Sequence, residues 1–314
     1  MAKAFVFPGQ GSQFVGMGKL LAEQFSQARA VFEEVDDSLG QKLSKIMFEG
    51  PDDELTLTAN AQPALMAVSI ALIRIMEAQG LEFSKKLYCV AGHSLGEYSA
   101  LCAAGMFSLS DTARLLRIRG NAMQQAVPVN KGAMAAIIGL DQDVVSDICV
   151  QASAYGVCQI ANDNGGGQFV ISGNKLAVEH AITLVTKKNV KRTIMLPVSA
   201  PFHSILMKPA SEAMHMALSH VICSNPTVPV ITNVSVNPEQ DNARIIDLLV
   251  KQIISRVRWR ETVQWFATND ITDVYEIGPG HVLTGLIRRI DKNLQGMSVG
   301  GVKEIEMALK ALGV

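Results

Sequence analysis

The sequence is poor in the features that mark disulfide-rich, zinc-stabilised or nucleic-acid-binding proteins. Its five cysteines are odd in number and include no Cys-x-x-Cys pair, which argues against a disulfide framework and against a zinc site. We therefore expect a reducing, cytoplasmic location and no bound metal. The formal net charge of −1 at pH 7 excludes the basic surface typical of general nucleic-acid binding, so we expect no nucleic-acid partner.

Long apolar runs are also scarce. The most apolar long segment, residues 63–76, contains Ser69 and Arg74 and is shorter than the roughly 20 residues that a membrane span requires. We expect a buried helix there and no membrane contact. The apolar stretch at residues 4–7 is followed at once by Pro8 and Gly9 and is too short for a signal peptide, so we expect the mature chain to start near Met1.

The sequence does contain a regular alternation of short apolar strands and helical patterns. Of its 314 residues, 48% are hydrophobic and 18% are charged, the balance of a folded protein with a large core. We predict strands at residues 4–7, 87–91, 228–232 and 273–277, and helices at residues 18–25, 28–39, 63–79, 95–104, 110–125, 204–221, 243–255, 261–268 and 282–291. Apolar strands separated by helices predict an α/β fold with a mostly parallel sheet covered on both faces.

A different order of elements interrupts this alternation at residues 129–198. The segment predicts a strand at 133–139, a helix at 143–154, strands at 158–161 and 168–172, a helix at 174–188 and a strand at 192–197. This β-α-β-β-α-β order is typical of a ferredoxin-like fold. We therefore predict a small inserted domain at residues 129–198 and a discontinuous large domain formed by residues 1–128 and 199–314.

The pattern Gly92-His93-Ser94-Leu95-Gly96 lies between a predicted strand and a predicted helix. In this context Gly-x-Ser-x-Gly indicates a sharp turn with an exposed serine hydroxyl, which nominates Ser94 as a nucleophile. The start of the following helix directs backbone N–H groups toward the same place. The alternative is an ordinary turn bounded by glycines.

A serine hydroxyl requires a nearby base, and histidine is the usual one. Of the six histidines, His203 is the strongest candidate, because it follows an apolar loop and directly precedes a helix. His281 is a second candidate, and an ordinary loop histidine is the alternative for His203. No acid between Ser94 and His203 ends a convincing strand of the large domain, so we expect an uncharged acceptor to orient the histidine.

Two further groups suit acyl chemistry. Gln10 lies between glycines after the first strand, and its N–H can form an oxyanion hole together with the N–H of Leu95. The glycines around Gln10 do not complete the Gly-x-Gly-x-x-Gly motif of dinucleotide-binding proteins, because Phe14 occupies the position of the third glycine. Arg114, Arg117 and Arg119 lie along one helix and cannot all face one way, so one of them is a candidate to face the site, and three solvated arginines are the alternative.

Five motifs in register resemble the malonyl-CoA:acyl carrier protein transacylases of bacterial fatty acid synthesis. They are residues 8–13 (PGQGSQ), 92–98 (GHSLGEY), 119–120 (RG), 201–203 (PFH) and 276–280 (EIGPG). The resemblance covers nearly the whole chain. It implies a hydrolase-like α/β domain with an inserted ferredoxin-like domain, which is the architecture predicted above. One departure is the segment 164–167 (NGGG), where relatives commonly carry a proline.

The resemblance also implies a role for individual residues. Ser94 would be the acylated nucleophile, His203 its base, and the Gln10 and Leu95 amides the oxyanion hole. Arg119 would bind the malonyl carboxylate, and the backbone carbonyl of Gln252 would orient the histidine. Asn162 and Asn233 would be supporting polar residues at the substrate site, and Phe202 resembles the form that prefers malonyl over methylmalonyl groups.

The implied reaction is a ping-pong transfer of malonyl from coenzyme A to acyl carrier protein, with no metal or redox cofactor. Three alternatives use the same residues differently: a serine thioesterase or esterase, a trans-acting acyltransferase of a polyketide pathway, or a non-catalytic carrier-binding scaffold. Because acyl carrier proteins of this pathway are acidic, a basic rim is expected. Its candidates are Lys187, Lys188, Lys191 and Arg192, or Arg256, Arg258 and Arg260.

Overall fold

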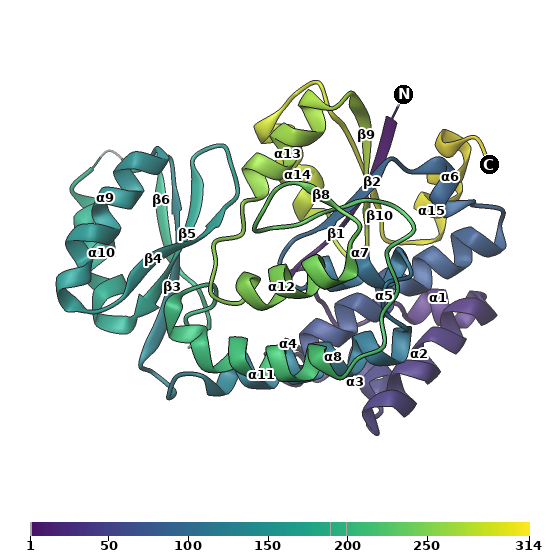
Figure 1. The fold of residues 1–314 in the computed structure, drawn as a ribbon, viewed down its shortest axis with the longest axis horizontal. Helices are drawn as coiled ribbons and strands as arrows, with labels where there is room; N and C mark the ends of the chain where they lie inside the picture. The colour runs from purple at the N-terminus through teal and green to yellow at the C-terminus, as the bar shows by residue number, and fades with distance from the viewer. Residues whose placement is uncertain (1, 189, 199) are drawn as a thin grey trace.

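The structure is a computed structural model that describes residues 2–188, 190–198 and 200–314, and these residues form two sheets (Figure 1). The larger sheet has six strands in the order β10-β9-β1-β2-β7-β8. The strands are β1 (Ala2–Phe7), β2 (Cys89–Gly92), β7 (Val230–Ile231), β8 (Pro238–Glu239), β9 (Ile271–Ile277) and β10 (Gln295–Val299). Every neighbouring pair is parallel except β7 and β8. The predicted mostly parallel sheet is therefore confirmed.

The central strands of this sheet are buried on both faces. In β1, Phe5 and Phe7 join one hydrophobic cluster, whereas Ala4 and Val6 join another on the opposite face. Helices α5 (Thr58–Ala78) and α7 (Gly96–Ala103) pack in the first cluster, and α13 (Trp259–Thr268) and α14 (Val282–Ile290) pack in the second. This double burial explains why the strands are apolar without alternation.

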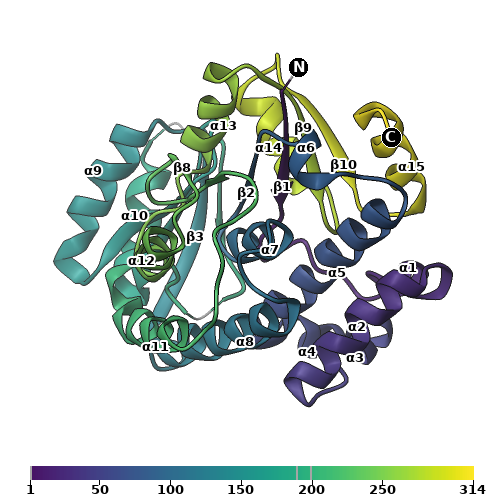
Figure 2. The ribbon, with the colours of Figure 1, turned by 45° about the vertical axis from the view of Figure 1, so that its right-hand side comes forward.

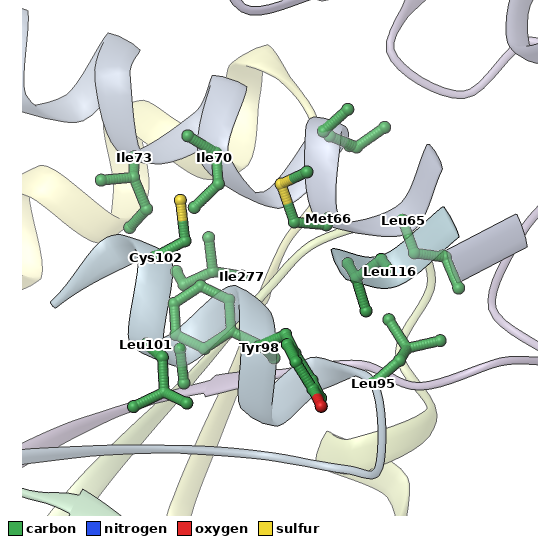
Figure 3. Close-up of a cluster of buried hydrophobic side chains, with 14 of the residues drawn as sticks. Leu65, Met66, Ile70, Ile73, Leu95, Tyr98, Leu101, Cys102, Leu116 and Ile277 are labelled. Atoms are coloured by element: carbon green, nitrogen blue, oxygen red, sulfur yellow. The ribbon is translucent and has the colours of Figure 1, made fainter. Parts of the chain in front are cut away.

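Helix α7 lies in the middle of the molecule (Figure 2). Its side chains Tyr98, Leu101 and Cys102 pack with Leu65, Met66, Ile70 and Ile73 of α5 and with Ile277 of β9 (Figure 3). All residues from Gly96 to Cys102 are buried. The turn that precedes α7 is therefore held between the sheet and the core.

Helix α5 is longer than the sequence indicated, because it begins at Thr58 and contains Pro63 in its interior. Within the described residues it is the one helix whose length and composition would suffice for a membrane span, and 89% of the relevant window is buried inside the protein. That burial is the pattern of a core helix, as the sequence analysis expected for this segment.

The remaining helices of the larger part complete its layers. They are α1 (Lys19–Gln24), α2 (Ser26–Leu39), α3 (Leu43–Glu49), α4 (Asp52–Thr56), α6 (Phe83–Lys86), α8 (Leu109–Gln125), α11 (Lys208–Ser219), α12 (Asn242–Gln252) and α15 (Val302–Leu312). The sequence did not predict α3, α4, α6 and α15 or the edge strands β8 and β10. Most of these helices are only one or two turns long, which is too short to show a helical spacing of apolar residues. Strand β10 is mostly accessible to solvent, so its sequence lacks the apolar pattern of a buried strand.

The second sheet and its two helices lie on one side of the molecule, in teal in Figure 1. Its elements are β3 (Gly132–Ile138), α9 (Gln142–Ala152), β4 (Cys158–Asp163), β5 (Gln168–Asn174), α10 (Lys175–Thr186) and β6 (Arg192–Met195). The four strands are antiparallel in the order β4-β5-β3-β6. This is the predicted β-α-β-β-α-β unit. The boundary predicted at Ser199 lies outside the described residues, as does Met1.

Candidate active site

Ser94 lies on a sharp turn between β2 and α7, at the carboxyl end of a central parallel strand. Its backbone φ of 55° is left-handed, which is rare for a residue other than glycine. A Cβ atom on Gly92 would lie 1.9 Å from the backbone carbon of Gly96, and one on Gly96 would lie 2.2 Å from the carbonyl oxygen of Phe7. Only glycine fits at either position, so the motif spacing is required by the geometry of the turn.

The His203 ring lies against the serine hydroxyl. Nε2 is 2.8 Å from Ser94 Oγ, and Nδ1 is 3.0 Å from the backbone carbonyl oxygen of Gln252. A carbonyl oxygen only accepts, so Nδ1 carries the proton and Nε2 is free to accept the hydroxyl proton. Burial, and then the nearby Arg119 charge, lowers the pKa of His203 to about 3. The imidazole is therefore neutral, as a general base must be.

No carboxylate among the described residues is hydrogen-bonded to His203. The acceptor is the peptide carbonyl of Gln252 at the end of α12, in agreement with the uncharged acceptor expected from the sequence. Ser94 and His203 thus form a catalytic pair, and a backbone carbonyl takes the place of the acid that orients the histidine in a triad. The competing candidate His281 is exposed at the start of α14 and has no hydrogen bond to Ser94.

Arg119 is the arginine of α8 that faces the site, and it is only 1% exposed. Nη2 is 3.1 Å from Ser94 Oγ and 2.9 Å from Gln252 Oε1, and Nη1 is 2.8 Å from Gln62 Oε1. Its Nε has no hydrogen-bond partner, and no acid in the described part of the chain forms an ion pair with it. Burial lowers the pKa of the guanidinium, yet arginine stays charged at neutral pH. A buried cation without a carboxylate partner suits an anionic ligand.

The other two arginines of this helix point elsewhere. The exposed Arg114 pairs with the half-buried Asp111 at 2.8 Å, and Arg117 donates to Asn60 and Gln41. This arrangement agrees with the expectation that the three arginines do not all face the same way.

Two amide side chains hold the turn. Asn233 accepts the N–H of Ser94 at 2.8 Å and donates to the carbonyl of Gly92 at 2.7 Å. Gln252 Nε2 donates to the carbonyl of Ser94 at 3.1 Å. Asn233 is fully buried and both ends of its amide are used within the turn, so its geometry is that of a support and not of a substrate contact.

The backbone N–H groups of Gln10 and Leu95 accompany the serine. Both residues line the cavity next to Ser94, and neither N–H is hydrogen-bonded to another group in the described residues. Two free donors beside a nucleophile have the chemistry of an oxyanion hole. The Gln10 side chain reaches Thr58 Oγ1 at 3.4 Å.

A cavity of about 300 Å³ opens above these groups, between the two sheets. Ser94, His203 and Arg119 lie at its polar end. Asn162 and Phe202 also line it, and the rest of the wall is mainly apolar, with Met123, Met134, Val170, Leu196, Val198, Leu283 and Leu286. The cavity therefore combines a charged end with an apolar approach. No cluster of potential metal ligands is present within residues 2–188, 190–198 and 200–314.

The sequence matches the acyl transferase domain family over residues 4–303. This chain belongs to that family. The malonyl CoA-acyl carrier protein transacylase of Bacillus subtilis (strain 168) is 44% identical over 312 residues, which cover 98% of this chain and 96% of that protein. The acyl-carrier-protein-S-malonyltransferase from Bartonella henselae, a crystal structure, is 63% identical, with a TM-score of 0.99 and full coverage of both chains.

A second solved structure bears on the partner of such enzymes. It is a complex of a type II PKS acyl-carrier protein with its malonyl-transacylase, and the matching chain is 40% identical with a TM-score of 0.96. The match covers 99% of this acyl transferase and 100% of that chain.

Several side chains of this acyl transferase site are not predicted by the sequence. Gln62 Oε1 accepts a hydrogen bond from Arg119, and Asn164 Oδ1 is 3.0 Å from Nε2 of His93. Glu97, in the first turn of α7, is completely buried. None of these residues belongs to a local pattern with a chemical meaning of its own, so only the folded structure relates them to the nucleophile.

The unusual NGGG segment forms the β4–β5 turn of the acyl transferase. Gly165, Gly166 and Gly167 all have positive φ angles, of 74°, 59° and 75°. A Cβ atom on Gly165 would lie 2.3 Å from the Ile290 side chain. Three successive glycines thus let the turn pack against the end of α14 while Asn164 contacts His93.

The two candidate basic patches differ in availability. Arg256 and Arg258 pair with Glu261, and Arg260 pairs with the fully buried carboxylate of Asp163. Lys187, Lys188, Lys191 and Arg192 are exposed and form no ion pair with the described residues. The patch formed by residues 187–192 is therefore the better candidate for binding an acidic carrier protein.

Proposed function

We propose that this acyl transferase moves the malonyl group from malonyl-CoA to the phosphopantetheine thiol of acyl carrier protein through a malonyl-Ser94 ester. The observation that carries this proposal is the position of Arg119, a buried cation without a carboxylate partner, 3.1 Å from the nucleophilic oxygen. A ligand with a carboxylate close to its reacting carbonyl satisfies both groups at once, and a malonyl thioester has that shape. The transacylase names of the relatives support the same substrate.

In the first half-reaction, His203 Nε2 takes the hydroxyl proton as Ser94 Oγ attacks the thioester carbonyl. The N–H groups of Gln10 and Leu95 stabilise the oxyanion of the tetrahedral intermediate. The carbon–sulfur bond then breaks, and the coenzyme A thiolate leaves with the proton held by His203. The product is a malonyl ester on Ser94, whose carboxylate is bound by Arg119.

The second half-reaction reverses the roles. The phosphopantetheine thiol gives its proton to His203 and attacks the ester carbonyl, and Ser94 regains the proton as it leaves. The backbone carbonyl of Gln252 keeps Nδ1 protonated in both halves, so Nε2 alternates between base and acid. Acyl exchange of this kind requires no redox cofactor, because no step changes an oxidation state. The N–H groups of Gln10 and Leu95 supply the oxyanion stabilisation that a metal ion gives in other acyl-transfer sites.

The remaining assigned residues shape the substrate site. We propose that Asn162 and Phe202, which line the cavity, contact the acyl group or the pantetheine arm, whereas Asn233 supports the turn. We also propose that residues 129–198 form an inserted domain, whose strands β3 to β5, with the β4–β5 turn and the segment 196–198 after β6, supply one wall of the cavity. Five free cysteines suit a reducing compartment, and we place the enzyme in the cytoplasm.

The decisive experiment maps the acyl group. Purified protein incubated with malonyl-CoA is digested, and peptide mass spectrometry locates the added malonyl group, which we expect on Ser94 and not in Ser94→Ala. Holo-acyl carrier protein, from either a fatty acid or a polyketide system, should discharge the ester, while water alone should not. Rapid discharge by water would identify a thioesterase, and full function of Ser94→Ala would indicate a carrier-binding scaffold.

A further inference from the structure

Glu97 is a fully buried carboxylate beside the site that the reaction described above does not use. It is 0% exposed and does not line the cavity, so it does not contact the substrate. Its Oε2 accepts two hydrogen bonds, from the backbone N–H of Asn233 at 2.8 Å and from Gln252 Nε2 at 3.0 Å. Both donors belong to residues that hold Ser94.

The amide of Gln252 connects this carboxylate to Arg119. Its Nε2 faces Glu97 Oε2 and the carbonyl of Ser94, and its Oε1 accepts Arg119 Nη2 at 2.9 Å. If the amide were rotated by half a turn, its NH₂ group would face the guanidinium, where there are only donors. Its oxygen would face the carboxylate and the carbonyl, where there are only acceptors. The carboxylate therefore favours a single orientation of the amide, together with the Ser94 carbonyl and the guanidinium.

Glu97 also places a carboxyl group on the opposite side of the Gln252 amide from Arg119. Burial raises the pKa of this carboxyl to about 7, so about half of it is ionised at neutral pH. A direct ion pair would occupy the guanidinium and compete with an anionic ligand. Through Gln252, the charge instead compensates the buried cation while Arg119 keeps an unpartnered Nε and no carboxylate contact.

We propose that Glu97 is a positioning residue that fixes the amide orientation of Gln252 and thereby holds Arg119 ready for the malonyl carboxylate. This inference rests on the proposed function, because it concerns how the same site selects a carboxylated acyl group. Loss of the carboxylate should impair the handling of malonyl groups and leave the chemistry at Ser94 itself largely intact.

The test compares Glu97→Gln with the wild type for transfer from malonyl-CoA and from acetyl-CoA. Glutamine has nearly the same volume, but it is uncharged and can turn an NH₂ group toward Gln252 Nε2, which removes one of the acceptors that favour the present orientation of the Gln252 amide. We expect KM for malonyl-CoA to rise by about tenfold, equivalent to ~1.4 kcal/mol, and acetyl transfer to change by less than about twofold. The matched control is Glu276→Gln, another fully buried glutamate that accepts two backbone N–H groups, from Leu283 and Thr284. It should lower stability without changing the ratio of malonyl to acetyl transfer.

Equal losses for both acyl groups, in step with a lower Tm, would mean that Glu97 is merely structural and would overturn the proposal. An unchanged Glu97→Gln would do the same. If that variant does not fold, Gln252→Leu decides: it keeps the backbone carbonyl for His203, and an unchanged acyl ratio would refute the inference. A wild type that forms no malonyl-Ser94 ester would instead refute the proposed function, so the two failures are distinguishable.

Discussion

Ser94 and His203 are 109 positions apart in the sequence, yet Oγ and Nε2 are 2.8 Å apart and both residues have left-handed backbones. Their φ angles are 55° and 57°. Such angles cost energy for residues with a Cβ atom and persist only where the surrounding structure enforces them. Here the glycines of the turn enforce the first, and the tight loop before α11 holds the second. The pair is thus positioned by backbone conformation as well as by packing.

Replacement of Arg119 should separate malonyl from acetyl transfer. Arg119→Ala should lower kcat/KM for malonyl-CoA by at least about thirtyfold, because the loss of a buried charge partner costs about 2–5 kcal/mol. Transfer of acetyl, which has no carboxylate, should fall far less. The matched control is Arg117→Ala, whose guanidinium binds Asn60 and Gln41 away from Ser94. Equal losses for the two acyl groups would contradict the role of Arg119.

A single methyl group at the turn should abolish acylation. In Gly96→Ala the new Cβ would lie 2.2 Å from the Phe7 carbonyl oxygen, so the turn must move away from β1. We expect the rate of malonyl-Ser94 formation, measured in single turnover, to fall by about 10²-fold or more. Gly285→Ala is the control, because a Cβ there meets nothing within 4 Å and the change should stabilise α14 by about 0.5–1 kcal/mol. A fully active Gly96→Ala would show that the turn tolerates displacement.

The buried imidazole should make stability depend on pH. The pKa of His203 is lowered to about 3 in the folded protein by burial, whereas an unfolded histidine titrates near 6.5. The unfolded state therefore binds the proton first, and the contribution of His203 to stability is present above pH 6.5 and is lost as the pH falls toward 3. Below pH 6.5, the free energy of unfolding of wild type should fall by up to about 1.4 kcal/mol per pH unit relative to His203→Asn. Urea denaturation between pH 7 and pH 5 measures this difference, and parallel curves would contradict the burial argument.

The exposed basic patch gives a prediction for the carrier. The double variant Lys191→Glu, Arg192→Glu should raise KM for acyl carrier protein several-fold at low ionic strength, and the effect should shrink with added salt. Arg260→Ala is the contrasting variant, because it leaves the buried Asp163 carboxylate unpaired. It should lower Tm strongly, since breaking a buried pair costs about 3–5 kcal/mol. An unchanged KM in the double variant would exclude this patch as the docking surface.

Much of the fold follows from local pattern. The apolar strand before Gly92, the helical period after Gly96 and the β-α-β-β-α-β order at residues 129–198 each have a strong period or a fixed order, and the structure contains all three. The elements that escaped, such as β10 and α3, are short or lie at an edge. Their formation depends on neighbours: β10 is a strand because β9 offers it an unpaired edge.

The site divides in a similar way. Residues at turns and strand ends, such as Ser94 and Gln10, are marked by the glycines that the backbone needs around them. No flanking pattern in the sequence identifies Gln62, Glu97 or Asn164. The role of a buried amide or carboxylate depends on the group to which it is hydrogen-bonded. Those partners are 57 residues away for Gln62 and 155 for Glu97.

The amino-acid sequence alone determined where the chain can turn sharply, which segments must be buried, and which side chains have the chemistry to attack, accept a proton or bind an anion. Those properties are local, since they follow from φ limits, hydrophobic period and side-chain pKa. Only the tertiary structure decided that the imidazole, the guanidinium and the free amides meet at one hydroxyl. That convergence also sets their environments: burial keeps His203 neutral, and it encloses the charged Arg119 without a carboxylate partner. Burial is a property of the whole packed structure.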